Sequence, residues 1–320
     1  MLNYIIRRLL VLMPILFGIS VIVFVIMRML PGDVARMILA GGEDGSSATS
    51  AKAVAALRDQ LGLNKPIIMQ YFDWIGGILT LDAGNSLWSG RPVLTEISER
   101  LPLTLELALM AVALSMLISI PIGVYSAVRQ DNWVDYVIRS VSIAGLAIPT
   151  FWVGTMLILV LTLQFNWAPP LGYVPFTTNP WVNIQQIIWP ALVLAFSNAA
   201  LLSRMTRSTM LDVMQEDYVR TARAKGLKPW VVMLKHALRN AILPVLTLSA
   251  IELGTLLNGT VVLETIFTLP GLGRYLVDAI YNRDYPVVQA IILLMGVIYV
   301  IMNLIVDIMY GVFDPRIRYD

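Results

Sequence analysis

The residue types that carry most enzymatic chemistry are scarce in this chain. It contains no cysteine and a single histidine, His236, in 320 residues. Thiol nucleophiles, disulfides and Cys/His zinc sites are therefore excluded, and so are metalloprotease motifs, which need two histidines. Only carboxylates remain as candidate metal ligands, and we predict no metal site.

A phosphate-binding loop is also missing from the sequence. The pattern that cradles a nucleotide phosphate ends in Lys followed by Ser or Thr. Neither residue follows any of the five lysines, which are Lys52, Lys65, Lys225, Lys228 and Lys235. No HExxH or G-x-S-x-G pattern can be read either. We therefore predict no catalytic residue and no cofactor in this chain, so any ATP that its function requires must be bound by another protein.

One acid lies where an ionisable group is costly. Glu252 falls inside a long apolar stretch, and an acid within a membrane span is a functional candidate by default. It could form a polar point on a substrate path and contact a substrate amine, or it could be protonated or hydrogen-bonded at a helix interface. Asn258, further along the same stretch, is a second candidate for the path.

The composition indicates a membrane protein. Hydrophobic residues make up 58% of the chain and charged residues only 14%, whereas globular domains are about a quarter charged. The chain thus lacks the polar surface that a water-soluble body of this size needs. The 23 basic and 21 acidic residues almost cancel, which leaves no general field for nucleic acid. We expect a lipid bilayer around the chain and no nucleic-acid partner.

Long charge-free stretches predict an all-α membrane protein with six transmembrane helices, because a bilayer core needs about 20 apolar residues in a helix. The first stretch is too long for a signal peptide and has no cleavage site, so it predicts a retained span. A segment rich in Pro, Asn and Gly, Asn166 to Trp181, divides the third span from the fourth. The predicted spans are 9–27, 107–128, 140–163, 187–202, 241–263 and 285–306.

The basic residues of the short loops predict that both termini are cytoplasmic. The segment from Arg28 to Glu99 then lies outside, and its length means that its charges count little in this rule. It includes a predicted amphipathic helix at 51–61. The chain is accordingly divided into three parts. These are a first helix with a large extracytoplasmic segment (1–94), a core of five helices with a cytoplasmic loop at 203–240 (95–309), and a cytoplasmic tail (310–320).

The cytoplasmic loop between the fourth and fifth spans is strongly basic. Residues 203–244 hold eight Lys and Arg against three acids. Apolar residues at helical spacing from Met210 to Ala222 predict an amphipathic helix, which Gly226 and Pro229 would end. A second short helix is predicted from Pro229, before the fifth span. On charge alone, the positive-inside rule or contact with anionic lipid explains this loop; a surface for a partner protein is the alternative.

Several motifs of the chain, in matching order, resemble a known family of membrane proteins. The family is the permease subunits of binding-protein-dependent ABC importers, in the dipeptide, oligopeptide and nickel group. Its general cytoplasmic signature is EAA, three residues and Gly, and here Arg220 stands at the glutamate position, so the chain departs from it there. The LPGD and PGLGR motifs most resemble the first of two non-identical permease subunits. The matching segments are LPGD (30–33), EDYVRTARAKGL (216–227), KHALRNAILP (235–244), ETIFTLPGLGR (264–274) and DPRIR (314–318).

The resemblance implies the six-helix type I ABC importer permease fold. It also implies partners: a second, homologous permease subunit, two P-loop ATPase subunits that bind ATP and Mg²⁺, and an extracytoplasmic solute-binding protein. The expected location is a bacterial or archaeal cytoplasmic membrane. The residues implied in ATPase coupling are Glu216, Asp217, Tyr218, Val219, Arg220, Thr221, Ala222, Arg223, Ala224, Lys225, Gly226 and Leu227. We expect the apolar face of this short helix to fit a groove of the ATPase.

The substrate and one rival function stay open at this point. Peptides are the first expectation, and nickel chelates, glutathione and oligosaccharides are alternatives. The rival is an ion-coupled secondary transporter or channel without ATPase partners. It would require broken helices with matching polar sites in two repeats, whereas the sequence has one acid deep in a span and no visible repeat. The PGLGR segment, Pro270 to Arg274, is either an outer gate or a tight turn.

Overall fold

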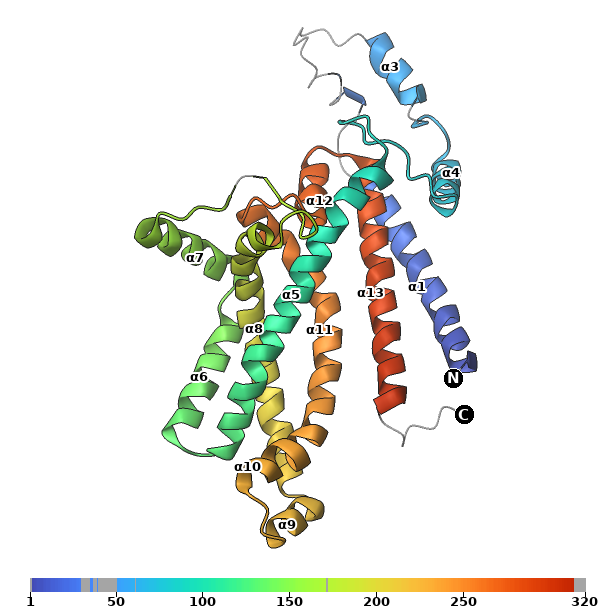
Figure 1. Ribbon diagram of the computed structural model, residues 1–320. Coiled ribbons are helices and arrows are strands. Elements are labelled where there is room, and N and C mark those ends of the chain that lie inside the picture. The colour runs from blue at the N-terminus through green and yellow to red at the C-terminus, as the bar shows by residue number, and fades with distance from the viewer. Residues whose placement is uncertain are drawn as a thin grey trace. The chain divides into compact units, whose positions relative to one another are not determined.

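The computed structural model describes residues 2–29, 35–36, 39, 51–60, 62–170 and 172–313, and these residues are predominantly helical (Figure 1). An isolated bridge between Asn85 and Pro92 accompanies the helices. The chain divides into two compact units. An outer unit comprises residues 1–101 and 275–300, and a core unit comprises 102–274 and 301–320. The all-α prediction is confirmed, while the LPGD and DPRIR motifs lie outside the described residues.

Most predicted spans correspond to long apolar helices. Within the described residues, four helices are long and apolar enough to cross a membrane, and a bent pair makes a fifth candidate. The first predicted span is a helix that is apolar over Met13–Met29, the part with described side chains. The helices are α1 (Leu2–Met29), α5 (Val93–Val128), the bent pair α6 (Trp133–Ala147) and α7 (Thr150–Phe165), α8 (Pro180–Met214), α11 (Leu238–Ile266) and α13 (Tyr285–Phe313).

The third span differs from its prediction as one straight helix. α6 and α7 meet at 102°. Between them, Ile148 is extended (φ −84°, ψ 126°) and Pro149 precedes the first residue of α7. A proline disfavours helical geometry in the residue before it and has no N–H to donate. The bend is therefore local, although the charge-free sequence runs through it.

The core unit is built around α8, which packs against α6, α7 and α11. At Gly123 of α5, an added Cβ would lie 2.7 Å from the Ser203 carbonyl oxygen, so α5 and α8 approach too closely for any larger residue. Asp135 of α6 is fully buried and accepts two hydrogen bonds from Arg207 of α8, at 2.8 and 2.7 Å. The core side chains include Leu103, Leu107, Ile187, Leu194, Leu263 and Phe267.

The outer unit adds three shorter helices: α3 (Ala51–Gln60), α4 (Ile67–Leu79) and α12 (Leu272–Tyr281), of which α12 begins in the core unit. α3 confirms the amphipathic helix predicted there. α4 packs along α1, where the Tyr71 and Ser20 hydroxyls are 2.8 Å apart and the rings of Trp74 and Phe24 are stacked at 5.9 Å. The outer unit thus contains a second apolar helix against the first span.

Candidate functional site

The predicted coupling segment contains a separate short helix, α9 (Asp217–Ala224). The sequence predicted one amphipathic helix from Met210 to Ala222. In the structure, α8 ends at Met214, and Gln215 and Glu216 interrupt the helix before α9 begins. Glu216 is extended (φ −66°, ψ 146°), so it turns the backbone out of one helix before the next begins. Gly226 follows α9 with φ +74°, the left-handed region that glycine adopts without strain.

α9 packs against a later segment of the same chain through one apolar face and one side-chain hydrogen bond. Val219 and Ala222 are buried and pack against Val232. The amide of Asn240 donates to the Tyr218 hydroxyl at 2.7 Å. Both contacts join α9 to the helix that leads into the fifth span. Because its apolar face is occupied internally, that face is not the surface that α9 offers to another protein, contrary to the sequence-based expectation.

The other side of α9 faces solvent and is polar. Arg220 and Asp217 form an ion pair at 3.4 Å, with side chains 68% and 97% exposed. Exposed pairs of this kind contribute little to stability, so these side chains remain free to interact with a partner. Ten of the twelve predicted coupling residues are exposed: Glu216, Asp217, Tyr218, Arg220, Thr221, Arg223, Ala224, Lys225, Gly226 and Leu227.

The segment after α9 is continuous with the fifth span. The sequence predicted a separate short helix from Pro229, but α10 (Pro229–Val231), the π-helical segment η1 (Val232–Ala237) and α11 follow one another without a loop. Pro229 is at the first helical turn, a position that tolerates its missing N–H. π-Helical turns often mark functional sites. α9 is therefore linked through the four residues 225–228 to a segment that continues into a candidate membrane span.

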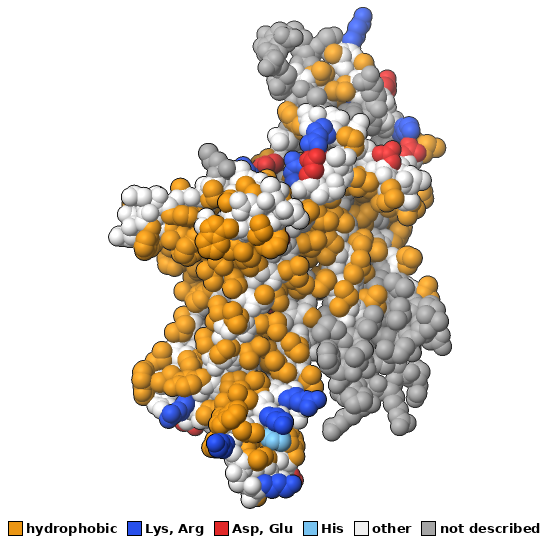
Figure 2. Space-filling model, in the orientation of Figure 1, with side chains coloured by type: hydrophobic (Ala, Val, Ile, Leu, Met, Phe, Trp, Pro, Cys, Tyr) orange, Lys and Arg blue, Asp and Glu red, His pale blue; other side chains and the backbone are white. Residues whose placement is uncertain are grey.

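An apolar hollow lies beside α9. It has a volume of about 580 Å³. Trp230 and Leu227, which are 60% and 40% exposed, present large apolar surfaces there. Figure 2 shows Lys, Arg and His side chains around hydrophobic ones at the end of the core unit that carries α9. The hollow was not predicted, because its walls come from segments distant in sequence: Val128, Met214, Leu227, Pro229, Trp230 and Met233 line it.

The two candidate path residues lie on α11. Glu252 is half-buried and has no hydrogen bond or ion pair to a residue that the structure describes. It is 14 positions beyond Leu238, which places it about 21 Å along the helix at 1.5 Å per residue. Asn258 is in the same helix, and its side chain lies outside the described part of the structure. The structure therefore places Glu252 in the middle of α11, where its carboxylate has no hydrogen bond or ion pair to a described residue.

At the far end of α11, Glu264 forms a buried clamp that sequence reasoning missed. Its carboxylate accepts hydrogen bonds from the Thr104 hydroxyl at 2.7 Å and from the Arg274 backbone N–H at 3.0 Å. The Thr104 oxygen in turn accepts from the Leu272 N–H at 2.9 Å. These bonds tie together the end of α11, a point about three turns into α5 and the start of α12. Glu264 is fully buried, so all of its hydrogen-bonding capacity is directed inward.

The clamp explains the glycines of the PGLGR segment. A Cβ on Gly271 would overlap the Glu264 carboxylate, and one on Gly273 would meet both that carboxylate and the Val261 backbone. The segment is a turn that becomes the first residues of α12, which agrees with the turn interpretation in its first half. The nearest signal in the sequence is a Glu directly after a predicted span with two glycines following it, Gly271 and Gly273, and it does not reveal that the carboxylate is buried.

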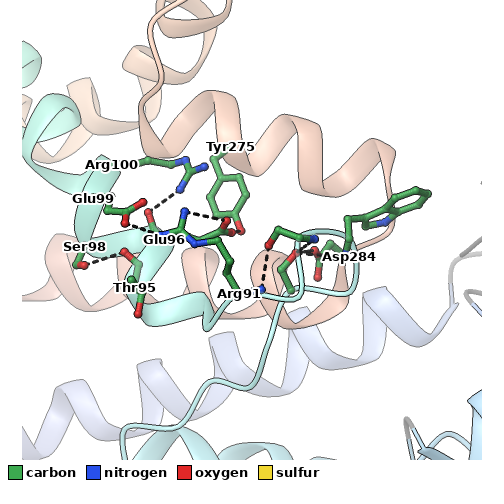
Figure 3. A network of polar contacts seen from close by, with 11 residues as sticks. Arg91, Thr95, Glu96, Ser98, Glu99, Arg100, Tyr275 and Asp284 are labelled. Carbon is green, nitrogen blue, oxygen red and sulfur yellow. Dashed lines mark hydrogen bonds and ion pairs between the residues drawn. The ribbon is translucent and has the colours of Figure 1, made fainter. Parts of the chain in front are cut away.

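In the outer unit, a polar network surrounds the beginning of α5 (Figure 3). Arg91 bridges Glu99 at 2.5 Å and Glu96 at 3.7 Å, and the Tyr275 hydroxyl donates to Glu96. The Arg100 guanidinium lies 4.2 Å from the centroid of the Tyr275 ring. Burial raises the pKa of the Tyr275 hydroxyl, and its bond to Glu96 raises it further. The network fixes the loop before α5 against α12.

A second set of contacts involves Asp284, just before α13. The Ser86 hydroxyl donates to its carboxylate at 2.5 Å and the Leu87 N–H donates at 3.2 Å. The Trp88 indole donates to the Asn282 carbonyl at 2.7 Å. Burial raises the pKa of Asp284, while these bonds to the carboxylate act in the opposite direction. The loop at 82–92 is thus attached to the start of the sixth span.

The described residues thus form several apolar helices long enough to span a membrane, and a short exposed helix, α9, packs against the segment that leads into one of them. Comparison with known families agrees. The family of inner membrane components of binding-protein-dependent transport systems matches residues 119–319, and its N-terminal part matches residues 1–108. The chain belongs to this family, and the resemblance drawn from its motifs is confirmed.

Three relatives match over nearly their whole length. The chain is 45% identical to the oligopeptide transport system permease protein AppB of Bacillus subtilis, with 99% of each chain covered. It is 41% identical to the glutathione transport system permease protein GsiC of Escherichia coli K12, with 100% of each covered. A putative peptide transport system permease protein of Brucella abortus is 40% identical, with 99% of each covered.

Proposed function

We propose that this chain is one of two permease subunits of an ATP-driven peptide importer in the cytoplasmic membrane. The second permease, two ATPase subunits that bind ATP and Mg²⁺, and an extracytoplasmic solute-binding protein complete the complex. The peptide substrate is supported by the names of the three relatives. The observation that carries the coupling role is α9, whose polar side is exposed while its apolar side is anchored to the helix of the fifth span.

In this proposal, the ATPase contacts the exposed side chains of residues 216–227. An apolar side chain of the ATPase occupies the hollow beside Trp230 and Leu227, where it adds the hydrophobic contact that the polar side of α9 lacks. Closure of the ATPase displaces α9. The contacts of Val219 and Tyr218 then transmit the displacement through η1 to α11.

The test is to replace Gly226 by leucine. The site has open space around it, so the folded core accepts the side chain, but φ of +74° strains any residue with a Cβ and alters the end of α9. In the complex reconstituted in liposomes with its partner chains, we expect ATP hydrolysis to persist while peptide uptake falls at least tenfold. Unchanged uptake would count against the coupling role.

Gly84→Leu supplies the matched control. Gly84 has φ +75° and equally open surroundings, but it lies in the outer loop before α5. It therefore introduces the same backbone strain away from α9. We expect Gly84→Leu to retain coupled uptake. An equal loss in both variants would assign the effect to strain in general.

We further propose that Glu252 lies on the substrate path and contacts the amine of a peptide. A half-buried carboxylate without a described partner is available to a cation. Glu252→Gln keeps the size and removes the charge. We expect uptake of peptides with a free N-terminus to fall several-fold and uptake of N-acetylated peptides to change little. Unchanged uptake of both would remove this charge from the mechanism.

A further inference from the structure

A cavity of about 310 Å³ lies within the outer unit and has no part in the proposed coupling. It is lined by the end of α1, by α4 with the turn before it, by Leu87 and by the start of α13, and it is open on one side. Lys65 and Asp73, which form an exposed ion pair at 2.6 Å, are among its lining residues. Their charges cancel, so the net charge of the cavity comes from Arg28.

Polar atoms without partners are concentrated in this cavity. In the described part of the chain, seven buried side-chain nitrogen and oxygen atoms have no hydrogen-bond partner, and four of them belong to residues that line it. Three are donors: Nε of Arg28, Nε1 of Trp74 and Nε2 of Gln289. The fourth, Oε1 of Gln70, is an acceptor. Gln289 is only 4% exposed, so its unpartnered amide has no access to bulk water.

The remaining bonds fix these groups in place. The Gln70 amide nitrogen donates to the carbonyls of Leu63 and Lys65, at 3.2 and 2.8 Å, which directs its oxygen elsewhere. The Arg28 guanidinium lies between the rings of Phe24 and Tyr285, at 5.3 and 5.1 Å from their centroids. The donors and the acceptor are therefore presented by a preformed site.

The site lies beside a membrane span. α4 contacts α1 at Ser20, nine residues before the end of α1, or about 13 Å at the helical rise. Its outward side chains include Ile68 and Phe72, which are 71% and 64% exposed. An apolar helix placed in this way adjoins lipid at the membrane interface. Unpartnered donors are costly in such surroundings, which favours a ligand that supplies the missing acceptors.

We propose that this cavity binds a phosphate-type oxyanion. One guanidinium and two neutral N–H donors suit an anionic oxygen cluster, and the Gln70 oxygen can accept from a hydroxyl or ammonium group attached to it. The anion comes either from the headgroup of a phospholipid in the outer leaflet or from free phosphate. This proposal is independent of the peptide-import function.

The first experiment measures binding to the purified, delipidated full chain in detergent. Phosphatidylglycerol is titrated by native mass spectrometry, and inorganic phosphate is tested by thermal shift and as a competitor. Trp74→Phe removes the indole N–H and keeps an aromatic ring, though a smaller one, and we expect about fivefold weaker binding. Trp133→Phe, an exposed tryptophan on α6 that is remote in sequence from the cavity residues, should bind as the unmodified chain does.

A second experiment measures thermal stability, where the same substitutions that weaken ligand binding should not lower the unfolding temperature of the ligand-free chain. Without ligand, Trp74→Phe and Gln289→Leu should unfold at or above the temperature of the unmodified chain, because each removes an unpartnered buried donor. When ligand is added, the unfolding temperature of both variants should rise by less than that of the unmodified chain. If phosphatidylglycerol binds and the variants weaken its binding, whereas inorganic phosphate does not bind, the anion comes from a lipid headgroup. If inorganic phosphate alone binds and the variants weaken its binding, the ligand is the free anion. Equal binding by the unmodified chain and Trp74→Phe, or no binding at all, overturns the proposal, even if Gln289→Leu fails to fold.

Discussion

The two ends of α11 use polar residues in opposite ways. At one end, α9 directs nearly all of its charged groups outward and keeps one side-chain hydrogen bond to α11, between Tyr218 and Asn240. At the other end, Glu264 is fully buried and directs its carboxylate to Thr104 and to the first turn of α12. The difference separates two roles that sequence alone confuses: exposed charges form a surface for a partner, whereas buried and satisfied ones hold segments of the chain together.

The largest stability effect is expected at the inward-directed end. Glu264→Leu leaves the Thr104 hydroxyl and the Arg274 N–H without their acceptor in a buried place. We expect the free energy of unfolding to fall by about 3 kcal/mol. Thermal unfolding of the purified chain in detergent measures it.

Glu252→Leu is the matched control on the same helix. Its carboxylate has no hydrogen bond or ion pair within the described residues, so the substitution should leave the unfolding temperature unchanged or raise it. Similar losses in the two variants would show that the bonds of Glu264 are not the source of the effect.

A smaller effect is expected where α9 is anchored. Val219→Ala removes part of the buried contact with Val232. We expect a loss of about 1 to 2 kcal/mol, mostly as local detachment of α9. Amide hydrogen exchange over residues 217–224 should therefore increase while exchange in α8 stays the same. An increase spread equally over both helices would contradict a local anchor.

The smallest effect is expected on the exposed side of α9. Arg220→Ala breaks only the exposed pair with Asp217, so stability should change by less than about 0.5 kcal/mol. Stimulation of ATPase activity by the permease should nevertheless change, if this side is the docking surface. A clear drop in unfolding temperature would mean that Arg220 supports the fold rather than the contact.

The sequence predicted the spans well because lipid imposes a strong rule on composition. Long charge-free stretches located the helices of the predicted spans, but most of these helices extend beyond the predicted bounds. α8 extends to Met214 although it contains Arg204 and Arg207, because Arg207 is paired with Asp135 of α6. Pro149 indicated a possible kink in the third span, but one proline in an apolar run does not reveal whether a helix tolerates it or turns, as it does here by 102°.

The coupling role of residues 216–227 stays a prediction, and the geometry of this segment depends on contacts that spacing does not show. The apolar pattern from Met210 is continuous in sequence, yet the helix is interrupted at Glu216, whose backbone is extended. Pro229 and Gly226 indicated a separate helix, but η1 joins it to α11. The Glu264 clamp was not predicted because an acid at the end of a span is equally compatible with water, and only the folded chain shows Thr104 beside it.

The division of α9 into two sides bears on how such complexes diversify. Its fold depends chiefly on Val219, Ala222 and Tyr218, and most other positions of the helix make no buried contact. In the proposed complex, substitutions at those positions change the charge pattern that α9 presents to an ATPase, at almost no loss of stability. Duplicated importers within one cell can therefore acquire separate ATPase partners by drift on one side of a single short helix, while the membrane part remains unchanged.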